Sequence, residues 1–195
     1  MNLWRTLVLS CCLATFACAS DPIASHPANA EIQRQISTIV AQVRTQGGAE
    51  LMVSLQRLVA FDVFAVDQVA TLAEDENARL RSNAMWVLAQ IRDTEQPARM
   101  ERIEAALREG LDDNDPSVRY EAATGLAARG EWDVLVVLIE GLEDADPGVR
   151  YRCNQQLIAT TSKDFGYSID ADPVQRGSAV AGWRSWYASW EKTRG

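Results

Sequence analysis

Apolar residues recur at intervals of three and four along most of this chain, which is the spacing of an amphipathic helix. In the first such segment the apolar positions are Ile32, Ile36, Ile39, Val40 and Val43, and the glycine pair Gly47–Gly48 follows as a stop signal. The predicted helices cover residues 31–45, 50–60, 61–74 and 97–111. The pattern therefore predicts a chain that is helical from residue 31 onward.

One short pattern occurs three times, at residues 77–88, 115–126 and 146–157. Each copy has a capping Asn or Asp, then an apolar residue followed by Arg, then a small residue and finally a Leu. The copies are Asn77, Leu80, Arg81, Ala84 and Leu88; Asp115, Val118, Arg119, Ala122 and Leu126; and Asp146, Val149, Arg150, Cys153 and Leu157. The cap accepts a free backbone N–H at a helix start, and the small residue lets a second helix approach closely. Such repetition predicts an open stack of helical hairpins.

The secondary structure of the segment between the last two copies can be predicted only from its place in the repeat. Val134–Leu142 is apolar except for Glu140 and Gly141, so alone it could be a buried strand. Its place in the repeat favours a helix instead.

The repeated pattern, Asp-Pro-x-Val-Arg-x-x-Ala-x-x-x-Leu, resembles HEAT repeats of the type also found in phycobilisome lyases. The resemblance covers roughly residues 61–161, and the first copy departs from it with Asn77-Ala78 for Asp-Pro. It implies an all-α fold, a short α-solenoid of HEAT-like helical hairpins with N-terminal helices. It also implies that the repeat arginines bond to acidic loops and set the stacking. That ladder would join Arg81, Arg119 and Arg150 to Asp113, Asp115, Asp144 and Asp146.

The last segment, residues 172–193, carries an aromatic stripe at helical spacing. Its members are Trp183, Trp186, Tyr187 and Trp190. The end of a repeat array needs a cap over its open apolar edge, so we expect an aromatic C-terminal capping helix. A face that binds a partner or contacts a membrane is the alternative.

The N-terminal residues have the form of a secretory signal peptide, with Arg5 and then a short apolar run. The sequence Thr15-Phe16-Ala17-Cys18 resembles the bacterial lipobox, with Thr15 where Leu or Val is usual. We expect a lipoprotein signal peptide over 1–17 and a flexible tether over 18–30, with Cys18 lipidated. Ordinary cleavage and an uncleaved anchor are the alternatives. The helical domain would span 31–195, tethered to the bacterial cell envelope at the outer membrane, facing the periplasm.

Composition excludes several partners and cofactors. The chain of 195 residues has a formal charge of −8, which argues against nucleic-acid binding. It has one histidine and no Cys-x-x-Cys pair, and its acidic loops lack EF-hand spacing, so no metal or other cofactor is expected. Cys153 takes the place of Ala84 and Ala122, which predicts a buried, unreactive thiol.

The positions that vary between the three copies are the candidates for partner binding. In HEAT-like arrays the second helices of the hairpins line the concave face. We expect contact residues at Trp86, Tyr120, Glu121, Tyr151 and Arg152, against the alternative of an ordinary solvated face. The function expected is a non-enzymatic scaffold for a protein partner. An enzyme or accessory subunit related to HEAT-like lyases, or a passive protein that contacts peptidoglycan, are the alternatives.

Overall fold

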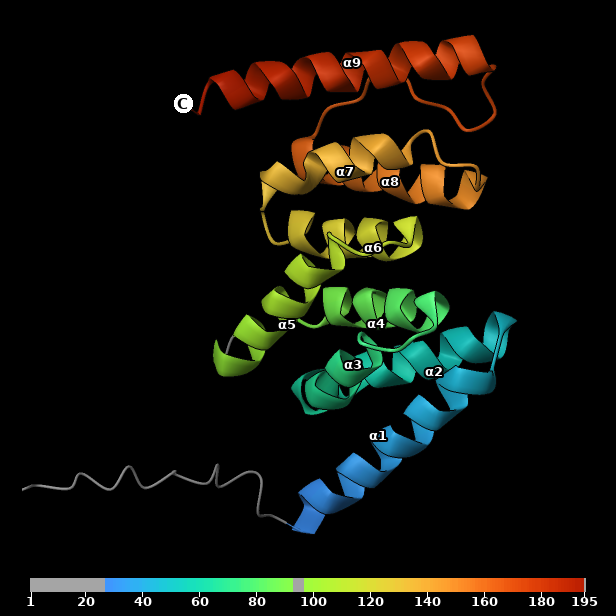
Figure 1. The fold of residues 1–195 in the computed structure, drawn as a ribbon, viewed down its shortest axis with the longest axis vertical. Coiled ribbons are helices and arrows are strands. Elements are labelled where there is room, and N and C mark those ends of the chain that lie inside the picture. The colour runs from blue at the N-terminus through green and yellow to red at the C-terminus, as the bar shows by residue number, and fades with distance from the viewer. Residues whose placement is uncertain (1–26, 93–96, 195) are drawn as a thin grey trace, which may run out of the picture.

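A computed structural model describes residues 27–92 and 97–194, and within these ranges the chain is helical with no strands. Figure 1 shows the helices stacked one above another from α1 at one end to α9 at the other. The α-helices are α1 (Pro27–Thr45), α2 (Gly48–Ala60), α3 (Val66–Leu72), α4 (Ala78–Gln90), α5 (Pro97–Gly110), α6 (Pro116–Ala127), α7 (Leu135–Gly141), α8 (Pro147–Thr161) and α9 (Pro173–Lys192), with short 3-10 helices η1 (Asp62–Ala65) and η2 (Trp132–Val134). The all-α solenoid expected from the repeats is confirmed.

Two differences from the expected boundaries are larger than a shift of one or two residues. Helix α1 begins at Pro27, so the last residues of the expected tether are helical; proline is well tolerated in a first helical turn. The single helix expected over 61–74 is divided into η1 and α3. Asp62 has a left-handed φ of 51°, a conformation that ends α2 and that Asp tolerates better than most residues.

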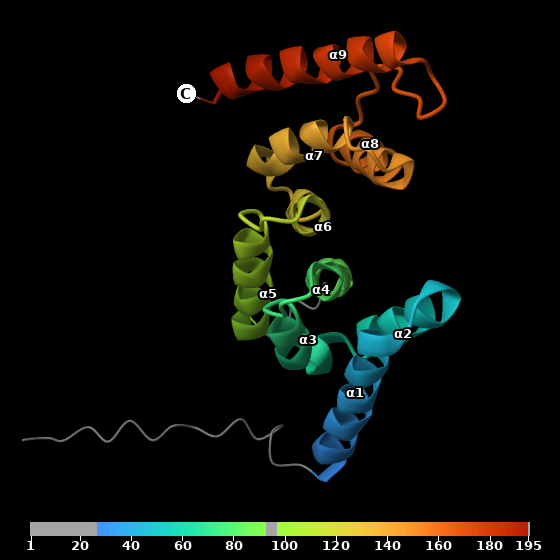
Figure 2. The same cartoon turned by 45° about the vertical axis from the view of Figure 1, so that its right-hand side comes forward.

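The repeats form three hairpins, α3–α4, α5–α6 and α7–α8. The second helices pack on one another along the stack: α4 against α6 is the most extensive contact in the described structure, and α6 packs less extensively on α8. Figure 2 shows α2, α4, α6 and α8 along one side, with α4 and α6 set back between α2 and α8. This is the concave side of the stack, and α3, α5 and α7 lie on the opposite side.

The repeated caps form as the sequence predicts. The side chains of Asn77, Asp115 and Asp146 accept the backbone N–H two residues on, at 3.0, 2.9 and 2.7 Å. The apolar residue, the small residue and the Leu of every copy are buried. The expected stripe is therefore the core-facing side of α4, α6 and α8.

Close packing within a hairpin depends on a glycine opposite the small residue. A Cβ added at Gly110 would lie 3.0 Å from the Cβ of Ala122, and one added at Gly141 would lie 2.4 Å from the Sγ of Cys153. The first helix of each of these hairpins therefore approaches the second at van der Waals contact.

Helix α9 closes the end of the stack over α7. Trp183, Val180 and Tyr187 are buried, while Ser185 and Ala188 of the same helix face solvent. The ring of Phe165 meets Trp183 edge-on at 4.8 Å. An apolar inner face and a small or polar outer face are what an array end requires.

Candidate partner-binding surface

The turns inside the hairpins share one hydrogen-bonded arrangement. Asp75, Asp113 and Asp144 each accept the N–H of the cap residue that follows, at 2.9, 2.8 and 2.8 Å. The repeat arginines then donate from Nη1 to two carbonyl oxygens of their own turn: Arg81 to Asp75 and Glu76, Arg119 to Asp113 and Asn114, and Arg150 to Asp144 and Ala145. Each arginine therefore holds its turn by satisfying backbone oxygens that no helix bonds.

Arg81 also crosses to the next repeat. Its Nε and Nη2 form a bidentate pair with the two carboxylate oxygens of Asp113, at 2.7 and 2.8 Å. Only 18% of the Arg81 side chain and 13% of Asp113 are exposed. The hydrogen bonds from Arg81 lower the pKa of Asp113, against the opposing effect of its burial. This pair fixes the first hairpin against the second.

The other two arginines differ from the expected ladder. Within the described ranges neither Arg119 nor Arg150 forms an ion pair, and Asp115 and Asp146 serve as caps instead. After the hairpin that carries Arg150, the described chain continues into α9, which is not a further copy of the repeat. A further ion pair, not predicted from the sequence, joins Arg44 of α1 to Asp75 at 2.5 Å. Asp75 could have been recognised, since it precedes its cap as Asp113 and Asp144 precede theirs.

Two of the expected contact residues bind each other. The Nε of Arg152 in α8 lies 3.3 Å from a carboxylate oxygen of Glu121 in α6. Glu121 is 12% exposed and Arg152 is 54% exposed. Burial raises the pKa of Glu121, and the charge of Arg152 opposes that effect. Glu121 thus links adjacent repeats, and Arg152 is the member that solvent or a partner can reach.

The three aromatic candidates differ in exposure. Trp86 and Tyr120 are half-buried and pack against the core. The Tyr120 ring lies 3.3 Å from a Cβ added at Gly141, so α7 of the next hairpin covers one side of it. Tyr151 holds the equivalent place in the last hairpin and is 51% exposed, because α9 packs on α7 instead. Tyr151 and Arg152 are therefore the most accessible of the five candidates.

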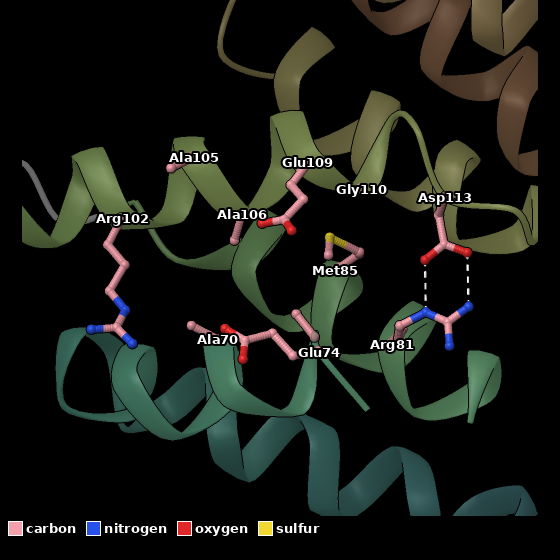
Figure 3. A pocket seen from close by; sticks show the side chains of 11 residues that line it. Ala70, Glu74, Arg81, Met85, Arg102, Ala105, Ala106, Glu109, Gly110 and Asp113 are labelled. Atoms are coloured by element: carbon pink, nitrogen blue, oxygen red, sulfur yellow. Dashed lines mark hydrogen bonds and ion pairs between the residues drawn. The ribbon is translucent and has the colours of Figure 1, made fainter. Parts of the chain in front are cut away.

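A hollow between α3 and α5, with two residues of α4 in its lining, was not predicted from the sequence. We call it the α3–α5 groove, and its volume is about 390 Å³. Its lining consists of Ala70, Ala73, Glu74, Arg81, Met85, Arg102, Ala105, Ala106, Glu109, Gly110 and Asp113. Figure 3 shows Glu74, in the turn after α3, and Glu109 of α5 pointing into the space between the helices, with the Arg81–Asp113 pair at one end.

Comparison with protein families agrees with this architecture. Residues 103–164 match the model for HEAT repeats, and residues 80–113 match the model for the PBS lyase HEAT-like repeat. The chain contains HEAT-like repeats. These matches fall on α4 to α8, the part in which the Arg81–Asp113 and Glu121–Arg152 pairs join one HEAT-like hairpin to the next. The search of curated proteins found no match.

Among the described residues, the thiol of Cys153 is the remaining candidate for chemical reactivity. Cys153 is buried beneath α7, and burial raises the pKa of its thiol to about 12. In the described part of the chain no three His, Cys, Asp or Glu side chains gather as metal ligands, and none of its helices could cross a membrane. Cys18, the expected lipidation site, lies outside the described residues.

Proposed function

We propose that the protein is a non-enzymatic lipoprotein of the bacterial envelope whose HEAT-like array docks a protein partner on its concave side. The observation that carries this proposal is the pair of neighbouring exposed side chains at the end of the repeats, Tyr151 and Arg152. Tyr and Arg are over-represented among residues that dominate binding energies at interfaces. Tyr120 and Glu121, at the equivalent places of the preceding hairpin, are less exposed. The last hairpin therefore offers the more accessible binding residues.

A substitution of these two residues tests the partner-binding proposal. We expect Tyr151→Ala combined with Arg152→Ala to remove a crosslinked partner that the wild-type protein yields in intact cells, read by mass spectrometry. The control pair is Val174→Ala with Lys192→Ala, because both residues are exposed on α9, beyond the repeats. If the Tyr151/Arg152 variant yielded the same crosslinked proteins as the wild type, this surface would be excluded as the partner-binding site.

The anchoring part of the proposal rests on Thr15–Cys18 and has its own test. We expect Cys18→Ser to move the protein from the membrane fraction to the soluble fraction, since acyl chains bind a membrane through burial of their CH₂ groups. The sequence Val8-Leu9-Ser10-Cys11 also resembles a lipobox, but it would leave a very short apolar region before the cysteine. Cys11→Ser is therefore the matched control and should leave fractionation unchanged. Equal release by both variants would argue against lipidation at Cys18.

A further inference from the structure

The α3–α5 groove has a feature that the rest of the array lacks at equivalent places. Four alanines line it, Ala70, Ala73, Ala105 and Ala106. The aligned positions of the following repeats hold Arg108, Leu111, Val136 and Val137, which are all larger. The smaller side chains at these positions leave more open space between the first two hairpins.

Charge inside the groove is distributed unevenly. Arg81 is paired with Asp113, and Arg102 is paired with Asp67 at 3.1 Å, so these charges compensate each other. Glu74 and Glu109 form no ion pair with any described residue, and both are exposed. The two glutamates therefore carry the net charge of the groove, and that charge is negative (Figure 3).

A groove with an apolar lining and two carboxylates is complementary to a long cationic side chain. Lys and Arg have apolar stems that lie along hydrophobic surface and a cationic head that remains near solvent. A stem would contact Ala73, Ala106 and Met85, while the head would lie between Glu74 and Glu109. A neutral apolar side chain would leave both carboxylates without a partner.

We propose that the α3–α5 groove binds a Lys or Arg side chain from a basic segment of a partner protein. This inference rests on the proposed scaffold function and names the chemistry of the partner. It places a second contact between the first two hairpins, apart from Tyr151 in the last one.

The test uses a fluorescein-labelled peptide of alternating Lys and Gly, with a Gln–Gly peptide as its neutral counterpart, and fluorescence anisotropy on the whole chain. We expect the Lys–Gly peptide to bind, with an affinity that falls as salt rises. Glu74→Gln with Glu109→Gln should weaken binding about tenfold or more. The matched control is Glu50→Gln with Glu101→Gln, which removes the same charge from exposed sites outside the groove.

A second variant tests the contribution of the shape of the groove separately from that of its charge. Ala106→Val introduces the side chain that the next repeat carries and leaves both carboxylates in place, and we expect it to weaken binding about fivefold while the helical circular dichroism is unchanged. Equal weakening by the control pair, or no binding of the Lys–Gly peptide, would overturn the groove proposal. If the wild-type protein yielded no crosslinked partner in cells, the scaffold function would be overturned instead, so the two failures are distinguishable.

Discussion

Replacing Arg81 with Ala is expected to lower the free energy of unfolding by about 3 kcal/mol, because removing one member of a buried ion pair leaves the other charge uncompensated. Arg81 makes the bidentate pair with Asp113 and also donates to two carbonyl oxygens of its own turn. Both side chains are largely buried. Urea unfolding followed by circular dichroism at 222 nm would measure the change.

Arg119→Ala is the matched control for this prediction. Arg119 holds the same place in the next copy and makes the same two carbonyl bonds, but it has no ion pair in the described structure. Its loss should cost about 1 kcal/mol, the usual contribution of such hydrogen bonds. Equal losses for the two variants would show that the Asp113 pair adds nothing to stability.

The Arg81 effect should also depend on pH in a defined direction. Asp113 has a lowered pKa in the folded protein, so its contribution is present above the ordinary value of 3.8 and is lost as the pH falls through the folded pKa. The stability gap between wild type and Arg81→Ala should therefore be full at pH 7 and narrow below about pH 3.8.

Gly141→Ala is the second substitution with a large expected effect. The new methyl group would lie 2.4 Å from the Sγ of Cys153 and 3.3 Å from both its Cβ and the Tyr120 ring, so α7 must move away from α8. Overpacking of this kind costs about 1–3 kcal/mol, and the better helix propensity of Ala offsets about 1 kcal/mol of it. We expect a net loss of up to about 2 kcal/mol in urea unfolding.

A rescue by Cys153→Ala would identify the cause. Ala is the residue that the other two copies hold at this place, and it removes the sulfur that the new methyl group meets. The Gly141→Ala/Cys153→Ala protein should be more stable than Gly141→Ala alone, with a favourable coupling energy in the double-mutant cycle. Additive losses in that cycle would mean that the strain arises elsewhere.

The helices and caps were predictable because they depend on neighbours in sequence. Asn77, Asp115 and Asp146 each bond a backbone N–H only two residues away. The buried stripe depends only on the helical period, so Leu88, Leu126 and Leu157 could be placed in the core directly. The break at Asp62 was not predictable in the same way, because no Gly or Pro marks it.

The candidate surface was predictable only in part, because exposure depends on the element that follows. Tyr120 and Tyr151 hold the same place in successive copies. Helix α7 covers one side of the Tyr120 ring, whereas Tyr151 is exposed in the described structure. The pairing of Glu121 with Arg152 also required the distance between α6 and α8. A repeat alignment gives equivalent positions, whereas exposure depends on what packs beside them.

The sequence by itself determined the hairpins, their order, their capped starts and their buried stripe, since these follow from short-range bonding and helical spacing. Only the tertiary structure decided which arginine pairs across repeats and where a groove opens. Arg81 reaches Asp113 while Arg119 bonds carbonyl oxygens alone, although the two share one sequence pattern. Such differences arise from the distance and rotation between neighbouring hairpins, which no local pattern specifies.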